Sequence, residues 1–173
     1  LSAMKEVFGR IRGLHVLYLG EGNNTAAALV LALAKTPQTR LTVVTPEGEG
    51  LPPALVSEAG RLAGDHRSEI EQHHRMDRLP LRVDVVYTAR WTTMGVPKSD
   101  PNWLEKYRPY AVTEAVMNRV SGEGTIFMHD LPAMRVQEVT DEVLDGRRSI
   151  AFRQALHKLT SAMAVLRWCT DSQ

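Results

Sequence analysis

The sequence predicts an α/β fold: a single domain in which helices cover both faces of a doubly wound, Rossmann-like parallel sheet. Two nearly continuous apolar segments, residues 15–19 and 83–88, are typical of parallel strands that are buried on both faces. Such segments alternate along the chain with segments whose apolar residues recur at helical spacing. A glycine-containing turn at residues 20–25 joins the first strand to an alanine- and leucine-rich segment, which is how a βαβ unit opens.

In the first half of the chain, the spacing of Met4, Val7 and Ile11 predicts a helix over residues 3–12, and Gly13 is a natural stop for it. The elements expected next are a strand at 15–19, a helix at 26–35, a strand at 41–45, a Gly- and Pro-rich loop at 46–53, and a helix at 54–63. A short edge strand at 69–73 lies in the polar, histidine-rich stretch 67–82.

The second half continues the alternation. The elements expected there are the strand 83–88, the Gly- and Pro-rich loop 91–102, helices at 103–107 and 112–120, a strand at 125–128, a short helix at 140–144 and a terminal helix at 152–168. Thr113 or a neighbour caps the helix at 112–120. Because strands and helices alternate throughout, we expect right-handed crossovers between parallel strands.

Composition narrows the functional class. The chain has 173 residues, of which 43% are hydrophobic, and this is enough for one domain with a real core. Its 21 Lys and Arg nearly balance its 20 Asp and Glu, so we expect neither nucleic acid nor a membrane surface as a partner. Small molecules are the expected partners. A single cysteine, Cys169, excludes an internal disulfide, and we expect a cytoplasmic protein.

Residues that often bind metals or fill cores were considered separately. His66, His73 and His74 have no cysteine or carboxylate around them at zinc-like spacing, so we expect a solvated polar loop and no metal. The methionines at positions 117, 128, 134 and 163 are expected to fill the core.

The strongest candidate site is the stretch His-Asp-Leu-Pro-Ala at residues 129–133, directly after the expected strand 125–128. Ligands of open α/β sheets bind at the carboxyl ends of strands, and a rigid turn there presents backbone carbonyls to a pocket. Asp130 can act on a ligand, or it can cap the following turn. His129 can contact a ligand, or it can be a satisfied structural histidine.

The turn at 20–25 has two interpretations. Gly20 and Gly22 resemble a degenerate dinucleotide fingerprint, in which glycines let the backbone approach a phosphate at a helix N-terminus. The third glycine is replaced by Thr25, and no acidic residue ends the strand at 41–45. The match is thus incomplete, but an NAD(P)-dependent oxidoreductase stays one alternative function. The other interpretation is that the turn serves only the tight strand-to-helix geometry.

Several segments together resemble one family. The stretch from His129 to Gly146 closely resembles the "HCLPA…R…EVTDEV…" signature of ornithine carbamoyltransferases, with Asp130 where that family has cysteine. Further segments resemble "IKEHFG" at residues 4–9, "GDGNN" at 20–24, "VVVTDTWVSMG" at 85–95, "YQVT" at 110–113 and "ENRLHAQKAVL" around 156–166. The resemblance extends from Met4 to Trp168 and is to the Asp/Orn-binding domain, which holds the acceptor, so residues 1–173 are expected to form that domain.

The resemblance implies a reaction and a set of roles. In such enzymes an amine attacks carbamoyl phosphate and expels phosphate, without a metal or an organic cofactor. Asp130 would lie beside the attacking amine, where it either attracts the protonated amine or takes its proton, and the Leu131 backbone would hold the carbamoyl group. With Asp130, the residues implied in binding the acceptor are Asn24, Arg90, Thr93 and Met94. His129 and Pro132 are further substrate-binding candidates in the same turn, and Lys158 is directed toward phosphate.

The departures from the family pattern concern the acceptor. Ala89 replaces the aspartate that takes the α-amino group of ornithine, and Thr93 replaces a serine. Arg90 stands where aspartate carbamoyltransferases, with "YxTRxQ", have an arginine that grips a carboxylate, although a solvated loop arginine is the alternative. Lys158 replaces an arginine and keeps its charge without the planar fork, unless it is only an exposed helix lysine. We therefore expect an amino acid or amine other than ornithine as the acceptor.

The resemblance covers only half of such an enzyme. The "STRT" and "HPxQ" segments, which bind carbamoyl phosphate in the family's other domain, are absent from this sequence. We expect the chain to be a piece of a longer protein and to be inactive by itself. We expect its full-length relatives to be homotrimers. The alternative is a non-catalytic binding or regulatory module that kept the fold, which the substitutions Asp130 and Lys158 would suit.

Overall fold

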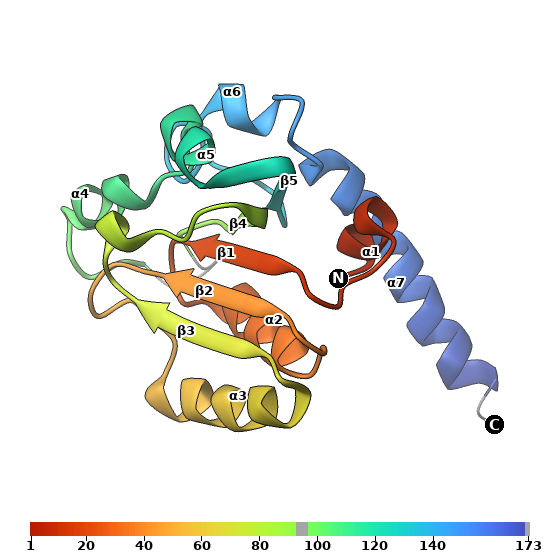
Figure 1. The fold of residues 1–173 in the computed structure, drawn as a ribbon. Coiled ribbons are helices and arrows are strands. Elements are labelled where there is room, and N and C mark those ends of the chain that lie inside the picture. The colour runs from red at the N-terminus through yellow and green to blue at the C-terminus, as the bar shows by residue number, and fades with distance from the viewer. Residues whose placement is uncertain (93–96, 172–173) are drawn as a thin grey trace.

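The structure is a computed structural model and describes residues 1–92 and 97–171. Five parallel strands form one sheet in the order β3-β2-β1-β4-β5. The strands are β1 (His15–Leu19), β2 (Arg40–Val44), β3 (Glu69–His73), β4 (Val83–Thr88) and β5 (Ser121–His129). The helices are α1 (Ser2–Phe8), α2 (Asn24–Ala34), α3 (Pro53–His66), α4 (Trp103–Tyr107), α5 (Glu114–Val120), α6 (Asp141–Leu144) and α7 (Ala151–Asp171), with short 3-10 helices at Met76–Arg78 and Arg108–Tyr110. Figure 1 shows this arrangement.

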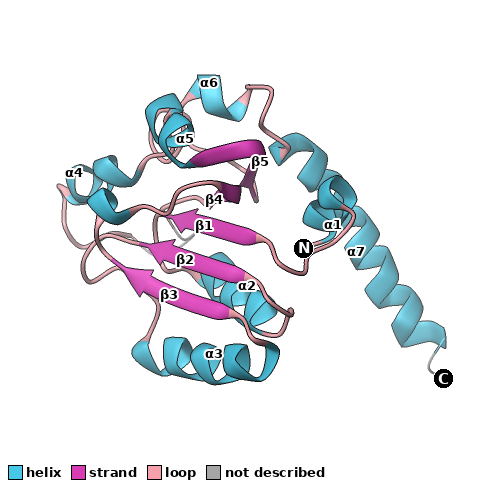
Figure 2. Ribbon diagram, viewed as in Figure 1, coloured by secondary structure: helices cyan, strands magenta, loops and turns pink. Residues whose placement is uncertain are grey.

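Helices cover both faces of the sheet, as the sequence predicts (Figure 2). One core cluster joins α1, α2 and α3 to one face through residues such as Leu33 and Ala59. The other joins α4, α5 and α6 to the opposite face through residues such as Tyr107 and Met117. All five residues of β1 are buried, because this central strand is covered on both sides. The fold is therefore a doubly wound α/β domain.

The order of the strands determines where a site can form. From β1 the chain proceeds outward to β2 and β3, and it then returns to the other side of β1 for β4 and β5. The loops that follow β1 and β4 consequently leave the sheet in opposite directions. Such a switch point opens a crevice at the carboxyl ends of the two strands.

Several expected boundaries are wrong, among them those of α1, α2 and β5; α3 and α7 also extend three residues beyond their expected ends, and α5 begins two residues late. Helix α1 ends at Phe8 and not at residue 12, because Gly9 adopts the left-handed conformation (φ 69°) that closes a helix. Helix α2 begins at Asn24, two residues before the expected start, because Asn23 caps it. Strand β5 begins at Ser121 and not at residue 125, because its first residues pair with β4 across a register shift.

Helix α7 differs most from expectation. It extends over Ala151–Asp171, and among its described residues Ala151 alone is buried. Its first turns are tied to α1, where Glu6 pairs with Arg153 and His157, and the remainder projects away from the sheet (Figure 1). Met163 on this helix and Met134 before it are exposed, so the expectation that they fill the core is wrong, whereas Met117 and Met128 are buried.

The edge strand β3 is confirmed at residues 69–73. Its two glutamates are exposed and its other three residues are half-buried, and its sequence, Glu-Ile-Glu-Gln-His, is mostly polar. Among the described residues, no helix is both long and apolar enough to cross a membrane.

The buried histidine of β1 gives a testable pH dependence. Burial, reinforced by the positive charge of Arg40, lowers the pKa of His15 below its ordinary value of 6.5. The unfolded chain therefore binds a proton more readily than the folded one, so the contribution of neutral His15 to stability is complete above pH 6.5 and is lost as the pH falls. We expect His15→Gln to lose less unfolding free energy than the wild type between pH 7.5 and pH 5, measured by urea denaturation. Identical pH profiles for the two proteins would contradict this account.

Candidate functional site

Asn23 joins the loop after β1 to the loop after β4. Its Oδ1 atom caps α2 by accepting the N–H groups of Thr25 at 3.0 Å and Ala26 at 3.1 Å. Its Nδ2 atom donates to the carbonyl oxygen of Arg90 at 3.2 Å. The hydroxyl of buried Tyr18 also donates to Asn23 Oδ1, at 3.3 Å. One amide side chain therefore fixes both the start of α2 and the first residues after β4.

Thr25 joins the same helix to the loop after β5. Its hydroxyl donates to Asp130 Oδ2 at 2.7 Å, and the Asp130 side chain keeps 32% of its surface exposed. Among the described residues no backbone N–H donates to this carboxylate, so Asp130 does not cap the following turn. The loops after β1, β4 and β5 thus converge at one edge of the sheet, which is the arrangement that the candidate residues require.

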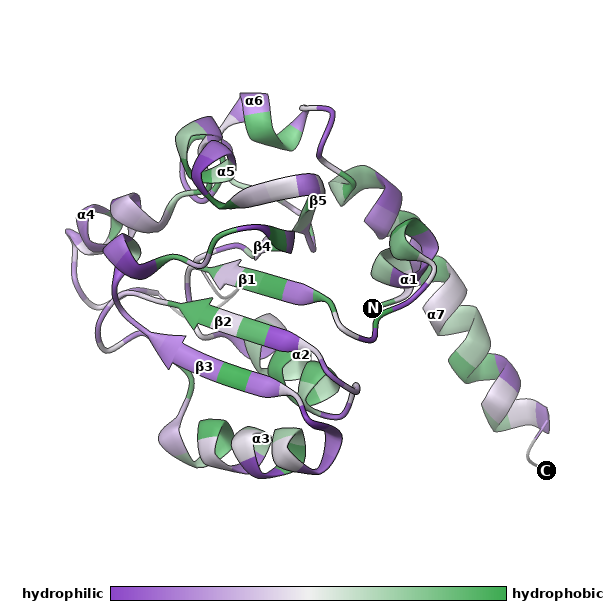
Figure 3. Cartoon of the chain, viewed as in Figure 1, coloured by the Kyte–Doolittle hydropathy of each residue, from purple (hydrophilic) through white to green (hydrophobic). Residues whose placement is uncertain are grey.

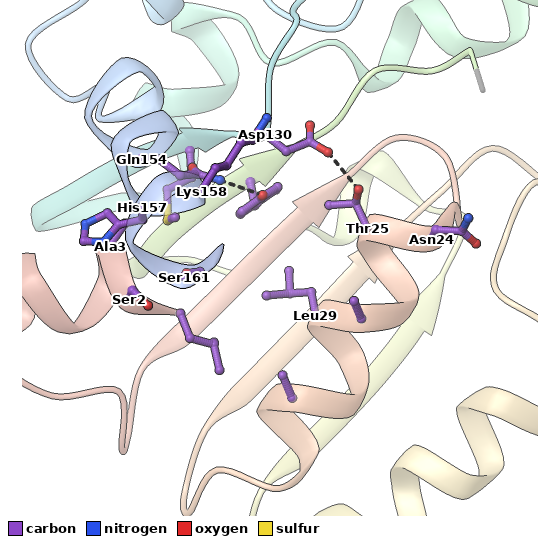
Figure 4. Close-up of a pocket in the computed structure, with 15 residues that line it drawn as sticks. Ser2, Ala3, Asn24, Thr25, Leu29, Asp130, Gln154, His157, Lys158 and Ser161 are labelled. Atoms are coloured by element: carbon purple, nitrogen blue, oxygen red, sulfur yellow. Dashed lines mark hydrogen bonds between the residues drawn. The ribbon is translucent and has the colours of Figure 1, made fainter. Parts of the chain in front are cut away.

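A pocket of about 560 Å³ opens beside this junction, between α2 and α7 (Figure 4). It is lined by Leu1, Ser2, Ala3, Asn24, Thr25, Ala28, Leu29, Ala32, Tyr87, Met128, Asp130, Gln154, His157, Lys158 and Ser161. Its α2 wall is mostly apolar, whereas Asp130 and Lys158 bring a carboxylate and an ammonium group to its upper end. A pocket that combines an apolar wall with placed polar and charged groups is typical of small-molecule sites.

Tyr87 forms part of the floor of this pocket. Its hydroxyl accepts a hydrogen bond of 2.8 Å from Gln154 Nε2 on α7. Burial, and then the negative charge of Asp130, raise the pKa of Tyr87 far above its ordinary value, so the phenol stays protonated and cannot serve as a base. Asp130 is then the pocket's available carboxylate.

Leu131 and Lys158 meet on the other side of Asp130. Lys158 Nζ donates to the Leu131 carbonyl oxygen at 3.2 Å, and both residues, with Pro132, also line a second hollow of about 450 Å³. The predicted group comprising Asp130, Leu131, Pro132 and Lys158 is therefore brought together. Lys158 is exposed and has this single carbonyl partner among the described residues.

Asn24 and Arg90 lie near the junction but are less closely placed. Asn24 lines the pocket, yet it is exposed and its side chain points away from Asp130 (Figure 4). Arg90 is half-buried and donates through Nε to Thr92 Oγ1 at 2.8 Å, and no carboxylate among the described residues pairs with it. Thr93 and Met94 lie outside the described residues.

His129 is fully buried beneath the site. Its Nδ1 atom accepts the N–H of Leu131 at 2.8 Å, which favours the structural interpretation of this residue. A direct contact between His129 and a ligand stays a prediction.

The glycine turn has a packing explanation. A Cβ atom on Gly22 would lie 2.4 Å from the backbone of Gly50 and Leu51, so no larger residue fits there. Gly20 has a φ of 123° and packs against the ring of Trp91. Both glycines are therefore required by neighbouring protein atoms, and the dinucleotide interpretation is not needed to explain them.

A cluster of opposite charges borders the site on the β2 side. Lys98 pairs with Glu21 and donates to the Tyr107 hydroxyl at 2.8 Å, while Tyr107 donates to Glu49 at 2.7 Å. Burial alone would raise the pKa of Glu49, but hydrogen bonds from Tyr107 and Lys106 and the charge of Lys98 together lower it. These contacts fasten the segment after residue 96 to the loops that follow β1 and β2.

Several contributing residues were not predicted. Thr25, Tyr87 and Gln154 enter the site through partners that are distant in sequence, and no local motif signals such pairs. Among the described residues no cluster of three or more His, Cys, Asp and Glu side chains could hold a metal ion.

Comparison with known proteins identifies the family. The family model described as "Aspartate/ornithine carbamoyltransferase, Asp/Orn binding domain" matches residues 12–169. The chain belongs to the aspartate/ornithine carbamoyltransferase family. It is similar to the ornithine carbamoyltransferases of Methanobrevibacter smithii (36% identity, 96% of this chain and 54% of that protein) and Gloeobacter violaceus (35%, 96% and 52%). It thus spans about half the length of the curated relatives it matches.

Solved carbamoyltransferase structures share the fold. The ornithine carbamoyltransferase from Pyrococcus furiosus superposes with a TM-score of 0.86 at 32% identity, covering 94% of this chain and 51% of that chain. The catalytic subunit of aspartate transcarbamoylase from M. jannaschii superposes with a TM-score of 0.77 at 27% identity, covering 96% and 52%. The expected fold class and the expected family are both confirmed.

The two adjacent asparagines offer a matched test of the site's construction. We expect Asn23→Ala to lower the unfolding free energy by about 1–2 kcal/mol, because two helix N–H groups lose their acceptor. Asn24→Ala, at an exposed position one residue later, should change stability by less than about 0.5 kcal/mol. Chemical denaturation of both variants checks this, and equal losses would refute the assignment of the cap to Asn23.

Proposed function

We propose that the chain is the acceptor-binding domain of a carbamoyltransferase, which moves the carbamoyl group of carbamoyl phosphate to the amine of a small acceptor. One observation carries the proposal: Asp130 is held by Thr25 at the end of a pocket that also contains Lys158. A carboxylate beside the attacking amine can take the proton that the nitrogen must lose. In this proposal Asp130 is the general base.

Leu131 and Lys158 have complementary roles in the proposal. The NH2 of a carbamoyl group needs hydrogen-bond acceptors, and the Leu131 carbonyl is such a group at the same turn. Lys158 now donates to that carbonyl, but a phosphate oxygen is a stronger partner for an ammonium group. Arrival of carbamoyl phosphate would therefore draw Lys158 away and free the Leu131 carbonyl.

We propose an acceptor other than ornithine. Compared with the ornithine carbamoyltransferase pattern, buried and apolar Ala89 replaces an aspartate, and Asp130 replaces a cysteine. Relative to that pattern, this chain lacks a carboxylate in the loop after β4 and has one in the loop after β5. Arg90 adds a positive charge after β4, which suits an acceptor that bears a carboxylate there.

The proposed enzyme needs a second half. Transfer requires both substrates in contact and a prearranged electrostatic site, and this chain spans about half the length of its relatives. We propose that the 173-residue chain is inactive alone and that a carbamoyl-phosphate-binding domain completes it, in a homotrimer as the resemblance implies. The expected cytoplasmic location stays a prediction.

The apolar face of α7 supports a missing partner domain. Its apolar residues at successive spacings of four and three are 57–68% exposed: Phe152, Leu156, Leu159, Met163 and Leu166. Figure 3 shows the hydrophobic bands along the projecting helix. An amphipathic helix of this kind is normally stabilised by burial of that face.

The activity is tested with the protein expressed from its complete reading frame. Carbamoyl phosphate is supplied with ornithine, aspartate and other amines in turn, and phosphate release and ureido product are measured. We expect product with an acceptor other than ornithine, and Asp130→Asn should lower kcat/KM by about 10²- to 10⁴-fold. Arg90→Ala should raise KM for a carboxylate-bearing acceptor, whereas exposed Glu142→Gln, the control, should match the wild type.

Two results count against this proposal. Absence of turnover with every acceptor, together with tight binding of one, would favour the non-catalytic module. Preference for ornithine would refute the assignment of acceptor specificity.

Amide hydrogen exchange in α7 tests whether a second domain covers this helix. In the 173-residue chain we expect the amides beyond Ser161 to exchange rapidly, since a projecting helix is only marginally stable. In the protein from the complete reading frame they should be protected by about tenfold or more. Equal exchange in both proteins would argue against a domain that covers α7.

A further inference from the structure

A buried histidine and a buried glutamate face each other below the turn that carries Asp130. His129 ends β5, Glu138 lies nine positions later, and both are fully buried. His129 Nε2 lies 3.3 Å from Glu138 Oε1, although the two are not aligned as a regular hydrogen bond. Buried charged groups are rare unless they are paired, so this pair requires an explanation.

The contacts of the histidine define its protonation. His129 Nδ1 accepts the N–H of Leu131, so this nitrogen carries a lone pair and no proton. The ring proton must then lie on Nε2, the nitrogen that faces Glu138. The Leu131 N–H thus selects the tautomer, and the carboxylate of Glu138 lies beside the nitrogen that carries the proton.

The glutamate holds the other end of the same turn. Its Oε1 atom accepts the backbone N–H of Met134, and its own carbonyl accepts the N–H of Val112 at 2.9 Å. The two members of the pair thus bind the backbone at residues 131 and 134, on either side of Pro132. The segment between these points includes Leu131, and Asp130 immediately precedes it.

The turn needs this support because its backbone is strained. Leu131 has a φ of 50° and Val136 a φ of 67°, in the left-handed region that residues with a Cβ, and β-branched residues above all, rarely adopt. Such conformations persist where the surrounding structure holds them. The direction of the Leu131 carbonyl, which receives Lys158, depends on this backbone conformation.

We propose that His129 and Glu138 are a pair of positioning residues, which set the direction of the Leu131 carbonyl and the place of the Asp130 carboxylate. This inference rests on the proposed function, because it assigns the pair to the same site. Neither side chain touches the pocket, so both act through the turn. The turn is thereby held before a substrate arrives, which is what transfer between two bound molecules requires.

Two replacements of the histidine separate positioning from packing. His129→Asn keeps an oxygen near the place of Nδ1 and can still accept the N–H of Leu131. His129→Gln places its amide near Nε2, toward Glu138, and loses that acceptor. Glu138→Gln keeps an acceptor for Met134 but removes the charge, and Glu142→Gln, an exposed glutamate on α6, is the matched control.

Each variant is assayed in the protein from the complete reading frame, and melting temperature is measured alongside. We expect His129→Gln and Glu138→Gln to lower kcat by about 10- to 100-fold with little change in acceptor KM, and His129→Asn to recover most of the loss. If kcat follows melting temperature across the variants, or if His129→Asn and His129→Gln behave alike, the positioning role is wrong.

A second measurement does not depend on turnover. In the 173-residue chain labelled with 15N-histidine, we expect the nitrogen chemical shifts of His129 to show a proton on Nε2, and Glu138→Gln to shift that signal. A proton on Nδ1 would overturn the inference whatever the enzyme does. An inactive wild type with the expected nitrogen shifts would instead overturn the proposed function and leave the pair as a support for the turn alone.

Discussion

The candidate site depends on the side chain of Asn23. An uncapped helix N-terminus leaves N–H groups without partners, and the Asn23 oxygen satisfies two of them at the start of α2. The nitrogen of the same amide holds the carbonyl of Arg90 after β4. Since the cap also fixes Thr25, it determines where the Thr25 hydroxyl meets Asp130. A short, planar amide thus links three loops with little freedom of adjustment.

The electrostatics of the site follow from this frame. Asp130 faces a pocket whose α2 wall is mostly apolar. Its partners are one hydroxyl and, more distantly, a histidine nitrogen that carries no proton. The carboxylate is therefore left without a cationic partner at close range among the described residues. Lys158 is bound to the neighbouring carbonyl instead. Opposite charges are present at one end of the pocket but are not yet paired, which leaves both available to ligands.

The sequence predicted all five strands, with β5 too short, and it predicted that the candidate residues follow strand ends. Apolar runs marked the central strands, and even the polar edge strand at 69–73 was predicted correctly. The start of β5 was not predicted, since Gly122 and Gly124, of a residue type that is uncommon in strand interiors, lie in its first half. Asp130 could be proposed from the sequence because it directly follows a buried strand. Its partner Thr25 could not be, since 105 residues separate the two and only the folded chain brings them together.

Of the buried pair His129 and Glu138, only the histidine could be singled out from the sequence. His129 stood out through its place at a strand end, but nothing local to Glu138 distinguished it from the exposed glutamate at position 142. Burial is a property of the packed domain, so a single sequence cannot report it for an isolated polar residue. The exposure of α7 was missed for the same reason, because its apolar spacing is that of any buried helix.

The polar character of β3 has a consequence for how the protein behaves at high concentration. An outer strand offers unpaired backbone groups along one side, and a flat apolar strand there would recruit strands from other molecules. Alternate glutamates along β3 place like charges on any second copy that approached in register. Growth of the sheet from molecule to molecule, the first step toward fibrils, is thereby discouraged at this border.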